Sequence, residues 1–513
     1  MTQPPTLTTR ASGVLLHPTS LPGPYGVGDL GPEARAFVDF LAEGAQRWWQ
    51  MLPVVPIGPG YSPYASPSAF AGNPQILSLE EVATTGLLAK RDIRAPRGLA
   101  ASRAQFDAAW AFKEPLLRRA FEQFEGDSGS RDRKSFDEFR GAAEAWLPDY
   151  ALFEALKTMH GGRPWNEWER SLRLREPGAL SRAREAHEGE VRFHEFLQFL
   201  FDRQWRALRA RANGKGGGLI GDLPIFVARD SADVWANTSV FELDGEGMPL
   251  RVAGVPPDYF SATGQLWGNP LYRWEVLRRR GYDWWVLRLR GTYSRFDAVR
   301  IDHFIGFSRF YAIPAGEKTA VNGKYEPGPG ADFFEKVLAA LGPVALIAED
   351  LGSMTPGVRT LRDQFGFPGM RVLQFAFSPD GDSPTYLPHN HVRRAVVYTG
   401  THDNDTTVGW FRARNQGRTK AAREAAKRER EFCLRYAASD GKEIHWDLIR
   451  LAMGSVADTA VFPMQDLLGL GTDARMNLPG SPAGNWSWRL TAGQASPRVA
   501  KRLAELTRTY GRA

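Results

Sequence analysis

The chain has 513 residues, of which 43% are hydrophobic and 24% are charged, a composition typical of a globular protein with a large core. The single cysteine, Cys433, excludes an internal disulfide, and no apolar run resembles a signal peptide or is long enough to cross a membrane. We therefore predict a cytoplasmic protein with no membrane partner.

The net charge of +7 is a mild excess for a chain of this length. Its most basic stretch, residues 412–431, is rich in alanine and contains three glutamates. This mixture favours a solvated helix face over a nucleic-acid site, so we expect no nucleic-acid partner. The 16 tryptophans fit a core, but they also fit a surface on which sugar rings stack.

Eight short apolar segments, rich in Val, Ile, Leu or Phe, end in polar residues and predict buried strands. In chain order they span residues 13–20, 48–56, 219–227, 296–302, 344–352, 370–377, 395–405 and 459–469. Most intervals between them carry helical patterns, for example residues 331–342. Continuous apolar strands that alternate with helices indicate a parallel sheet covered by helices, and eight such units predict a (β/α)8 TIM barrel.

Two intervals are too long for a single crossover helix. Residues 75–215, after the second strand, have mostly amphipathic helical patterns. Residues 230–292, after the third strand, include the aromatic segment 256–272, which we predict to be a substrate loop. We expect both to be subdomains inserted at the carboxyl face of one catalytic barrel that spans residues 1–513.

Polar and ionisable residues stand where several predicted strands end, which is the face where barrel enzymes carry their active sites. These residues are Asp222, Asp302, Glu349, His402, Asp403, Gln465 and Asp466. Any one of them alone could cap a turn, but their convergence indicates a joint site. Arg300 precedes Asp302 by two residues, so both side chains point to the same side of the strand. The arginine should therefore keep this carboxylate ionised.

Several carboxylates without an obvious serine or cysteine nucleophile favour glycoside chemistry. A retaining enzyme needs an ionised carboxylate as nucleophile and a protonated carboxyl as acid, about 5–5.5 Å apart, and neighbouring strand ends can supply that separation. Asp302 suits the nucleophile. Glu349, at the end of an apolar run, could have its pKa raised by burial and serve as acid and then base. Asp403 could orient the sugar hydroxyls.

A metal site is the competing interpretation. The residues that could ligate a cation are His402, Asp403, Asp302 and His303. Arg300 argues against this interpretation because its charge would repel a cation next to Asp302. The first strand also offers only one histidine, His17. We therefore expect no metal.

Two loops supply aromatic candidates for sugar binding. Residues 60–74 form a polar, aromatic loop after the second strand, which is either a substrate wall or a plain loop. Trp267 and Tyr272 are candidates for stacking on sugar rings, and the alternative is aromatic packing between subdomain and barrel.

Several longer motifs extend over essentially the whole chain. They include HPTSLPGPYG, SPYASPSAFAGNP, GDLPIFVARDSADVWAN, PPDYFSATGQLWGNP, RIDHFIGF, IAEDLG, GTHDNDTTVGW, MQDLLGLG and RMNLPG. With these motifs the chain resembles the amylomaltases, the bacterial 4-α-glucanotransferases or disproportionating enzymes of glycoside hydrolase family 77. The first and fourth motifs are the most specific to that family.

The resemblance implies a role for each matching residue. Asp302 would be the nucleophile, Glu349 the acid/base and Asp403 the transition-state stabiliser. The implied substrate-binding residues are Tyr64, Asp222, Asp258, Tyr259, Phe260, Gln265, Trp267, Arg300 and His402. No metal or organic cofactor is implied. The implied partners are maltooligosaccharides, amylose or glycogen-type glucans, with glucose as an acceptor.

The implied reaction moves a segment of an α-1,4-glucan to a new 4-hydroxyl by a retaining double displacement. An α-glucan hydrolase is the alternative, since the same carboxylates would serve it, although the loop around Trp267 favours transfer. A catalytically inert glucan-binding protein is a third possibility, but all three carboxylates are present. Transfer requires that water is excluded and that an acceptor is held at high effective concentration.

Overall fold

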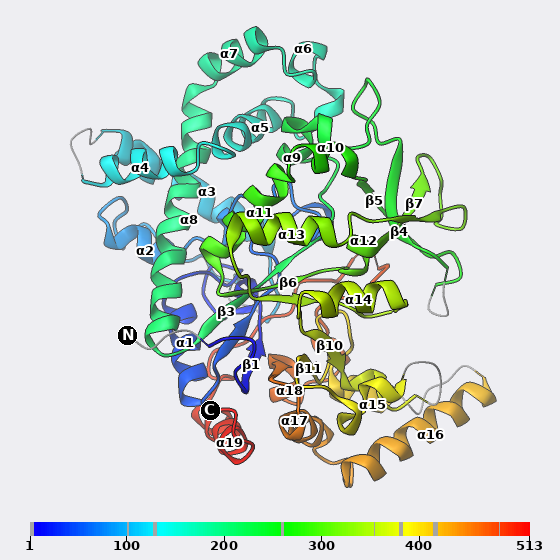
Figure 1. The fold of residues 1–513 in the computed structure, drawn as a ribbon. Helices are drawn as coiled ribbons and strands as arrows, with labels where there is room; N and C mark the ends of the chain where they lie inside the picture. The colour runs from blue at the N-terminus through cyan, green and yellow to red at the C-terminus, as the bar shows by residue number, and fades with distance from the viewer. Residues whose placement is uncertain are drawn as a thin grey trace.

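Eight parallel strands close into a barrel, as the sequence predicts (Figure 1). The computed structural model describes residues 5–99, 102–126, 131–257, 261–352, 354–378, 383–413, 419–481 and 483–513. The barrel strands are β1 (Ala11–Leu15), β2 (Trp48–Gln50), β3 (Gly218–Leu223), β6 (Ala298–Ile301), β9 (Leu346–Ala348), β10 (Gly369–Val372), β11 (Ala395–Tyr398) and β12 (Thr459–Pro463). Each pairs with the next barrel strand along the chain, and β12 pairs with β1 to close the ring. The fold is therefore a (β/α)8 barrel.

All eight predicted segments overlap a barrel strand, but the strands end earlier than predicted. The segment 395–405, for example, is a strand only as far as Tyr398. Most of the remaining residues of these segments belong to the loops at the carboxyl end of the barrel, and residues 296–297 and 344–345 precede their strands. Their polar character reflects the active-site face rather than the sheet.

Side chains on the barrel strands alternate between the barrel interior and the helical layer. On β6, Ala298 lies in the interior cluster, whereas Val299 packs in the larger outer core. Trp48 fills the interior next to two glycines. A Cβ at Gly13 would lie 2.5 Å from the Cβ of Trp48, and one at Gly218 would lie 2.6 Å from its ring. Both neighbours must therefore lack a side chain for the indole to fit.

Helices between the strands cover the outer face of the barrel (Figure 1). They include α1 (Pro32–Glu43), α11 (Asp283–Arg295), α13 (Ala331–Leu341), α14 (Pro356–Gln364), α17 (Ile444–Gly454) and α19 (Pro497–Thr509). Shorter helices lie in the connecting segments: α9 (Ala232–Ala236), α10 (Trp274–Arg279), α12 (Ile305–Ser308), α15 (Thr407–Ala413) and α18 (Met464–Leu467). Helix α19 lies beside α1, where Gln46 donates a hydrogen bond to Thr507.

The long interval between β2 and β3 is helical. It contains α2 (Leu79–Thr84), α3 (Phe106–Gly126), α4 (Arg131–Ala142), α5 (Leu147–Met159), α6 (Arg170–Arg173), α7 (Pro177–Ala186) and α8 (Glu188–Gly214). Phenylalanines from α3, α4 and α8 pack together, with ring centroids of Phe124 and Phe196 4.9 Å apart. These contacts give the helices an apolar core of their own, which runs on into the core around the barrel.

A small antiparallel sheet, which the sequence analysis did not anticipate, stands beside the barrel's carboxyl face. Its strand order is β5 (Gln265–Pro270), β4 (Arg251–Val255), β7 (Arg309–Pro314) and β8 (Lys324–Pro327). It joins the segment after β3 to the segment after β6, so two loops that are separate in sequence form one structural unit. Strand β5 carries the predicted sugar-binding residues Gln265 and Trp267.

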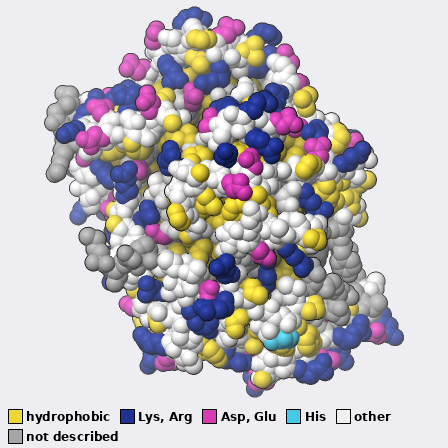
Figure 2. Space-filling view, in the orientation of Figure 1, with side chains coloured by type: hydrophobic (Ala, Val, Ile, Leu, Met, Phe, Trp, Pro, Cys, Tyr) yellow, Lys and Arg dark blue, Asp and Glu magenta, His cyan; other side chains and the backbone are white. Residues whose placement is uncertain are grey.

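Charged side chains of both signs are mixed over the molecular face in Figure 2, and Lys and Arg gather at its lower right edge, where α16 (Lys420–Ala437) lies. Arg512 closes the amino-terminal end of the barrel. Its guanidinium donates hydrogen bonds to backbone carbonyls that include those of Ala11, Asp458 and Ser455. Across the described residues, no helix has both the length and the apolar character that crossing a membrane requires.

Candidate active site

The candidate site continues the inward-facing rows of three neighbouring strands. The barrel interior contains one residue from each of β3, β6 and β9: Ile220, Ala298 and Ile347. Two positions further along the same strands come Asp222, Arg300 and Glu349. Because side chains alternate along a strand, these three also point inward, and they lie at the carboxyl end. Strand periodicity thus gathers a charged cluster on top of an apolar barrel core.

Arg300 pairs with two carboxylates at once. Its Nη1 lies 2.8 and 2.7 Å from the two carboxylate oxygens of Asp222, and its Nη2 lies 2.9 Å from Oδ1 of Asp302. The guanidinium is only 4% exposed, so pairing is needed to offset its desolvation. Burial raises the pKa of Asp222, and the charge of Arg300 opposes that rise. The arginine therefore holds the carboxylates of Asp222 and Asp302 in place.

Glu349 stands next to Asp302 because β6 and β9 are paired in register. Ile301 lies opposite Ala348, so the following residues, Asp302 and Glu349, leave the two strands side by side. Two further backbone bonds run between these turns, from Glu349 N–H to the carbonyl of Ile301 and from Phe304 N–H to the carbonyl of Glu349. The two carboxyl groups are thus adjacent by the geometry of the sheet.

Two backbone N–H groups hold the carboxyl group of Glu349. The N–H of His303 donates to Oε2 at 2.8 Å, and that of Leu351 donates to Oε1 at 2.9 Å. His303 has φ of +51°, a left-handed conformation that is uncommon for residues other than glycine. Burial raises the pKa of Glu349 from 4.5 to about 7; Asp302 adds to this rise, while Arg300 and the two N–H groups oppose it. Glu349 can therefore donate and accept a proton near neutral pH.

Tyr64 connects the Arg300 cluster to the β11 loop. Its hydroxyl donates to Oδ2 of Asp222 at 2.8 Å and lies 2.9 Å from Nε2 of His402. The rings of Tyr64 and His402 are stacked, with centroids 5.3 Å apart. His402 Nε2 lies 3.4 Å from Oδ1 of Asp403. This chain of contacts brings Asp222, His402 and Asp403 into one site.

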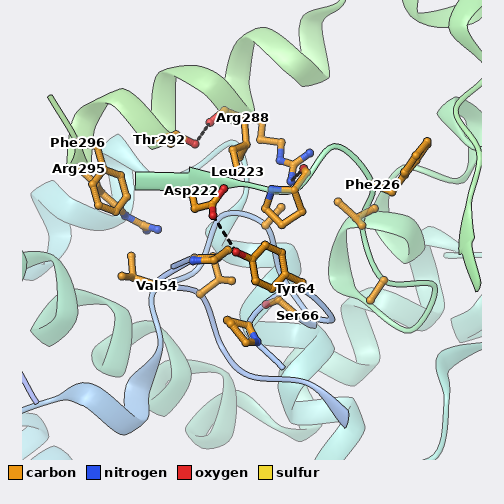
Figure 3. A pocket seen from close by; sticks show the side chains of 17 residues that line it. Val54, Tyr64, Ser66, Asp222, Leu223, Phe226, Arg288, Thr292, Arg295 and Phe296 are labelled. Carbon is orange, nitrogen blue, oxygen red and sulfur yellow. Dashed lines mark hydrogen bonds between the residues drawn. The ribbon is translucent and has the colours of Figure 1, made fainter. Parts of the chain in front are cut away.

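A pocket of about 500 Å³ adjoins the site on the side of Tyr64 and Asp222 (Figure 3). Its walls come from the loop after β2, the end of β3 and helix α11, and Val54, Phe226 and Arg288 are among the lining residues. In Figure 3 the hydroxyl of Tyr64 points at the carboxylate of Asp222. Asp222 lines the pocket but Asp302 and Glu349 do not, so the pocket lies beside these two carboxyl groups rather than over them.

Asp403 is also held by a segment that no sequence pattern connected with the site. Asn477 donates from Nδ2 to Oδ1 of Asp403 at 2.6 Å, and Arg475 donates from Nη2 to the backbone carbonyl of Asp403 at 2.5 Å. Both residues follow the last barrel strand. They belong to the RMNLPG motif, which was matched to the family without a role for any of its residues.

Trp267 lies at the edge of the site, on strand β5. Its indole is 37% exposed and meets the ring of His303 edge-on at 5.0 Å, and its Nε1 donates to Oε1 of Gln265. Tyr272 is buried, with its hydroxyl donating to the carbonyl of Ile225, so it packs between elements and does not face a sugar. The remaining predicted substrate residues, Asp258, Tyr259 and Phe260, lie outside the described residues.

The histidines and carboxylates of the site do not form a cation cage. Within the described part of the chain, no group of three or more His, Cys, Asp and Glu side chains is arranged to hold a metal ion. His17, from the end of the first strand, is buried near His402, and burial lowers its pKa to about 3. The positive charge that faces Asp302 comes from Arg300.

The sequence matches the family described as 4-alpha-glucanotransferase, glycoside hydrolase family 77, over residues 16–495. The chain belongs to this family. It is 52% identical over 502 residues to the 4-alpha-glucanotransferase of Thermus thermophilus, covering 96% of this chain and 97% of that relative. It is 48% identical over 510 residues to the 4-alpha-glucanotransferase of a Synechocystis strain, covering 99% of each.

A solved structure agrees with these relatives. The amylomaltase from Streptococcus agalactiae in complex with acarbose superposes with a TM-score of 0.92 at 35% identity, covering 98% of this chain and all of that one. The likeness extends over the barrel and the segments inserted in it. The 4-alpha-glucanotransferase activity, rather than the hydrolase alternative, is thus the function of this chain, and its substrates are glucans.

Proposed function

We propose that three carboxyl groups of this 4-alpha-glucanotransferase carry a retaining double displacement. Asp302 is the nucleophile, Glu349 the acid and then the base, and Asp403 stabilises the oxocarbenium-like transition state. The observation that supports this assignment best is the contrast between the two adjacent carboxyl groups. Asp302 is paired with Arg300, whereas the pKa of Glu349 is raised to about 7 by burial.

In the first step, a carboxylate oxygen of Asp302 attacks the anomeric carbon of the donor glucan. Glu349 gives its proton to the glycosidic oxygen, and the fragment on the reducing-end side leaves. In the second step, Glu349 takes the proton of an acceptor's 4-hydroxyl, and that oxygen displaces Asp302 from the anomeric carbon. Two inversions retain the configuration, and the proton returns to Glu349.

The finer substrate range is part of the proposal. Maltooligosaccharides, amylose and glycogen-type glucans are the proposed donors, and glucose is among the proposed acceptors. The substrate-binding residues are Tyr64, Asp222, Gln265, Trp267, Arg300 and His402, to which the sequence analysis adds Asp258, Tyr259 and Phe260. The exposed indole of Trp267 beside His303 offers an apolar face for an acceptor ring. The acarbose complex of the Streptococcus relative supports a site shaped for a chain of sugar rings.

The inserted segments are proposed to favour transfer over hydrolysis. Residues 75–215 and 230–292 would act as subdomains at the carboxyl face of the barrel, where they restrict water and hold the acceptor sugar. No cofactor enters the proposed mechanism. A cytoplasmic location stays a prediction, supported by the single buried cysteine.

The proposed function is tested by product analysis with maltotriose and no added metal. We expect chains longer than the substrate, together with glucose and little net gain in reducing ends. Only shorter products with rising reducing ends would contradict transfer.

The proposed roles are tested with an activated donor, a maltosyl fluoride, which needs no acid for its first step. Glu349→Gln should form a covalent maltosyl adduct that mass spectrometry detects, whereas Asp302→Asn should form none. An adduct on Asp302→Asn would show that another residue is the nucleophile.

A further inference from the structure

The segment that follows the last barrel strand returns to the active site and makes three hydrogen bonds there. Asn477 donates its backbone N–H to the carbonyl of His402 at 3.1 Å and its side-chain amide to Asp403, while Arg475 donates to the carbonyl of Asp403. We infer that Arg475 and Asn477 are positioning residues that set the orientation of the Asp403 carboxylate for the transfer reaction. This inference rests on the proposed role of Asp403.

Asn477 engages one carboxylate oxygen of Asp403 and leaves the other available. Oδ1 accepts the amide of Asn477 at 2.6 Å and also faces Nε2 of His402 at 3.4 Å. Among the described residues, Oδ2 accepts no hydrogen bond, and the side chain is 45% exposed. A carboxylate held through one oxygen presents the second in a fixed direction. That oxygen can then accept hydrogen bonds from sugar hydroxyls.

Arg475 connects the two partners through its planar guanidinium. Its Nη2 lies 2.5 Å from the carbonyl oxygen of Asp403, and its Nε lies 2.7 Å from the carbonyl oxygen of Asn477. The rigid fork of an arginine fixes the distance between two acceptors, which the single ammonium group of a lysine does not. Arg475 therefore holds the backbone of Asp403 and that of Asn477 at the separation that their side-chain bond needs.

The β11 loop lies beyond the sheet, so contacts of its own side chains and backbone with neighbouring segments hold it. Strand β11 ends at Tyr398, so Asp403 lies in a turn beyond the ladder of strand hydrogen bonds. A second pocket, of about 420 Å³, lies directly beside this turn and is lined by His402, Asp405, Gln465 and Arg475 among others. Thr401 bonds to Asn404 within the turn and Tyr64 holds His402, but among the described residues only Asn477 donates a hydrogen bond to the carboxylate of Asp403.

The test compares Arg475→Met, Arg475→Lys and Asn477→Ala with the unmodified enzyme. A displacement of catalytic groups by about 1 Å costs on the order of 100-fold in rate, so we expect kcat to fall between about 10-fold and 100-fold in Arg475→Met. Asn477→Ala should lose a similar factor, Arg475→Lys should lose less, and KM for maltotriose should change less than about threefold.

The measurement that separates positioning from stability is inhibition by acarbose, whose flattened, basic first ring imitates the charge of the transition state. Asp403 stabilises that state rather than the ground state, so inhibition should weaken by the same factor by which kcat/KM falls. The double variant of Arg475 and Asn477 should lose little more than either single variant, because the two act as one unit. Full additivity or unchanged acarbose inhibition would overturn the inference.

Arg103→Met is the matched control. Arg103 donates to the carbonyl of Asp473 at 2.7 Å and to the hydroxyl of Ser487 at 3.1 Å, so it binds the same segment from outside without touching Asp403. If Arg103→Met lowers kcat as much as Arg475→Met does, the segment is only a structural support, and the inference fails. If Arg475→Met does not fold, Arg475→Lys and Asn477→Ala carry the test.

Asp403→Asn separates this inference from the function on which it rests. If Asp403→Asn loses its activity while Arg475→Met and Asn477→Ala keep theirs, the positioning role is wrong and the proposed mechanism stands. If Asp403→Asn keeps normal turnover, the proposed role of Asp403 is wrong as well. If Asp403→Asn, Arg475→Met and Asn477→Ala all lose activity, and acarbose inhibition weakens in step with kcat/KM, the result supports both proposals.

Discussion

Glu349→Gln should make the folded enzyme more stable at pH 8 but not at pH 5. In the unfolded chain this carboxyl group has its ordinary pKa of 4.5, whereas burial raises the pKa in the folded enzyme to about 7. Between these two pH values the folded state holds a proton that the unfolded state has released. A rise in pH therefore favours unfolding across that interval.

The size of the effect follows from the same two values. Each tenfold change in proton affinity corresponds to ~1.4 kcal/mol. The rise in the pKa of Glu349 from 4.5 to about 7 thus corresponds to roughly 3 kcal/mol of lost stability, fully present above pH 7 and absent below pH 4.5. Glutamine never ionises, so it removes this penalty at pH 8. Its NH2 group cannot accept one of the two backbone N–H bonds, a loss that is the same at both pH values, so the stability gain is confined to pH 8.

The assay is urea unfolding followed by tryptophan fluorescence at both pH values, for the unmodified enzyme and for Glu349→Gln. Glu505→Gln, an exposed change on helix α19, is the control and should shift stability equally at both. In parallel, kcat/KM of the unmodified enzyme should fall above about pH 7, because Glu349 must be protonated to act as the acid. A stability difference that does not depend on pH would refute the raised pKa and the acid role built on it.

Three further predictions concern other parts of the molecule. Arg512→Met should lower the free energy of unfolding, measured by urea unfolding, by roughly 2–4 kcal/mol, because buried backbone carbonyls lose their hydrogen-bond donor. Arg512 lies at the end of the barrel opposite the site, so the folded variant should keep its kcat, and a large fall in kcat would contradict this placement. Trp267→Ala should raise KM for the acceptor glucose about tenfold and increase the hydrolysed fraction, measured by reducing ends, and unchanged values would exclude it from the acceptor site. Dialysis against EDTA should leave kcat unchanged, since the positive charge beside Asp302 comes from Arg300; a loss that Ca²⁺ or Mg²⁺ restores would contradict this.

The barrel was predictable from the sequence because buried parallel strands leave a strong local signal. Residues 344–348, for example, are a continuous run of Val, Ala, Leu and Ile, which is typical of a strand buried on both faces. The strand ends were less predictable. In residues 395–405 the apolar part and the polar loop follow each other without a break, and hydrogen bonding rather than composition ends the strand at Tyr398.

The small sheet shows what local patterns do not contain. Strands β4 and β7 pair along Arg251–Gly254 and Tyr311–Pro314, segments that lie on either side of β6 in the chain. Both are short runs with buried residues in the middle, and a short apolar run by itself identifies neither a strand nor its partner. Pairing between distant segments depends on how the barrel brings them together, which no single segment encodes.

The candidate site was predictable to the extent that strand geometry determines it. Asp222, Arg300, Asp302 and Glu349 stand at strand ends in a fixed register, so a correct barrel implies their proximity. The contact between Asn477 and Asp403 has no such basis, since it joins two loops that are 74 residues apart. The roles assigned to these residues stay predictions that the proposed experiments address.

Three different restraints hold the three carboxyl groups, and this difference has a consequence for how the site assembles. A buried guanidinium fixes Asp302, backbone N–H groups of two adjoining turns fix Glu349, and a segment beyond the last strand fixes Asp403. The first two depend only on the paired strands β3, β6 and β9. The third depends on β11 and β12, which pair with each other further round the barrel, because Asp403 follows β11 and Asn477 follows β12. The complete site therefore forms only when β12 has joined β11, so a partly folded chain that has Asp302 and Glu349 in place still lacks an oriented Asp403.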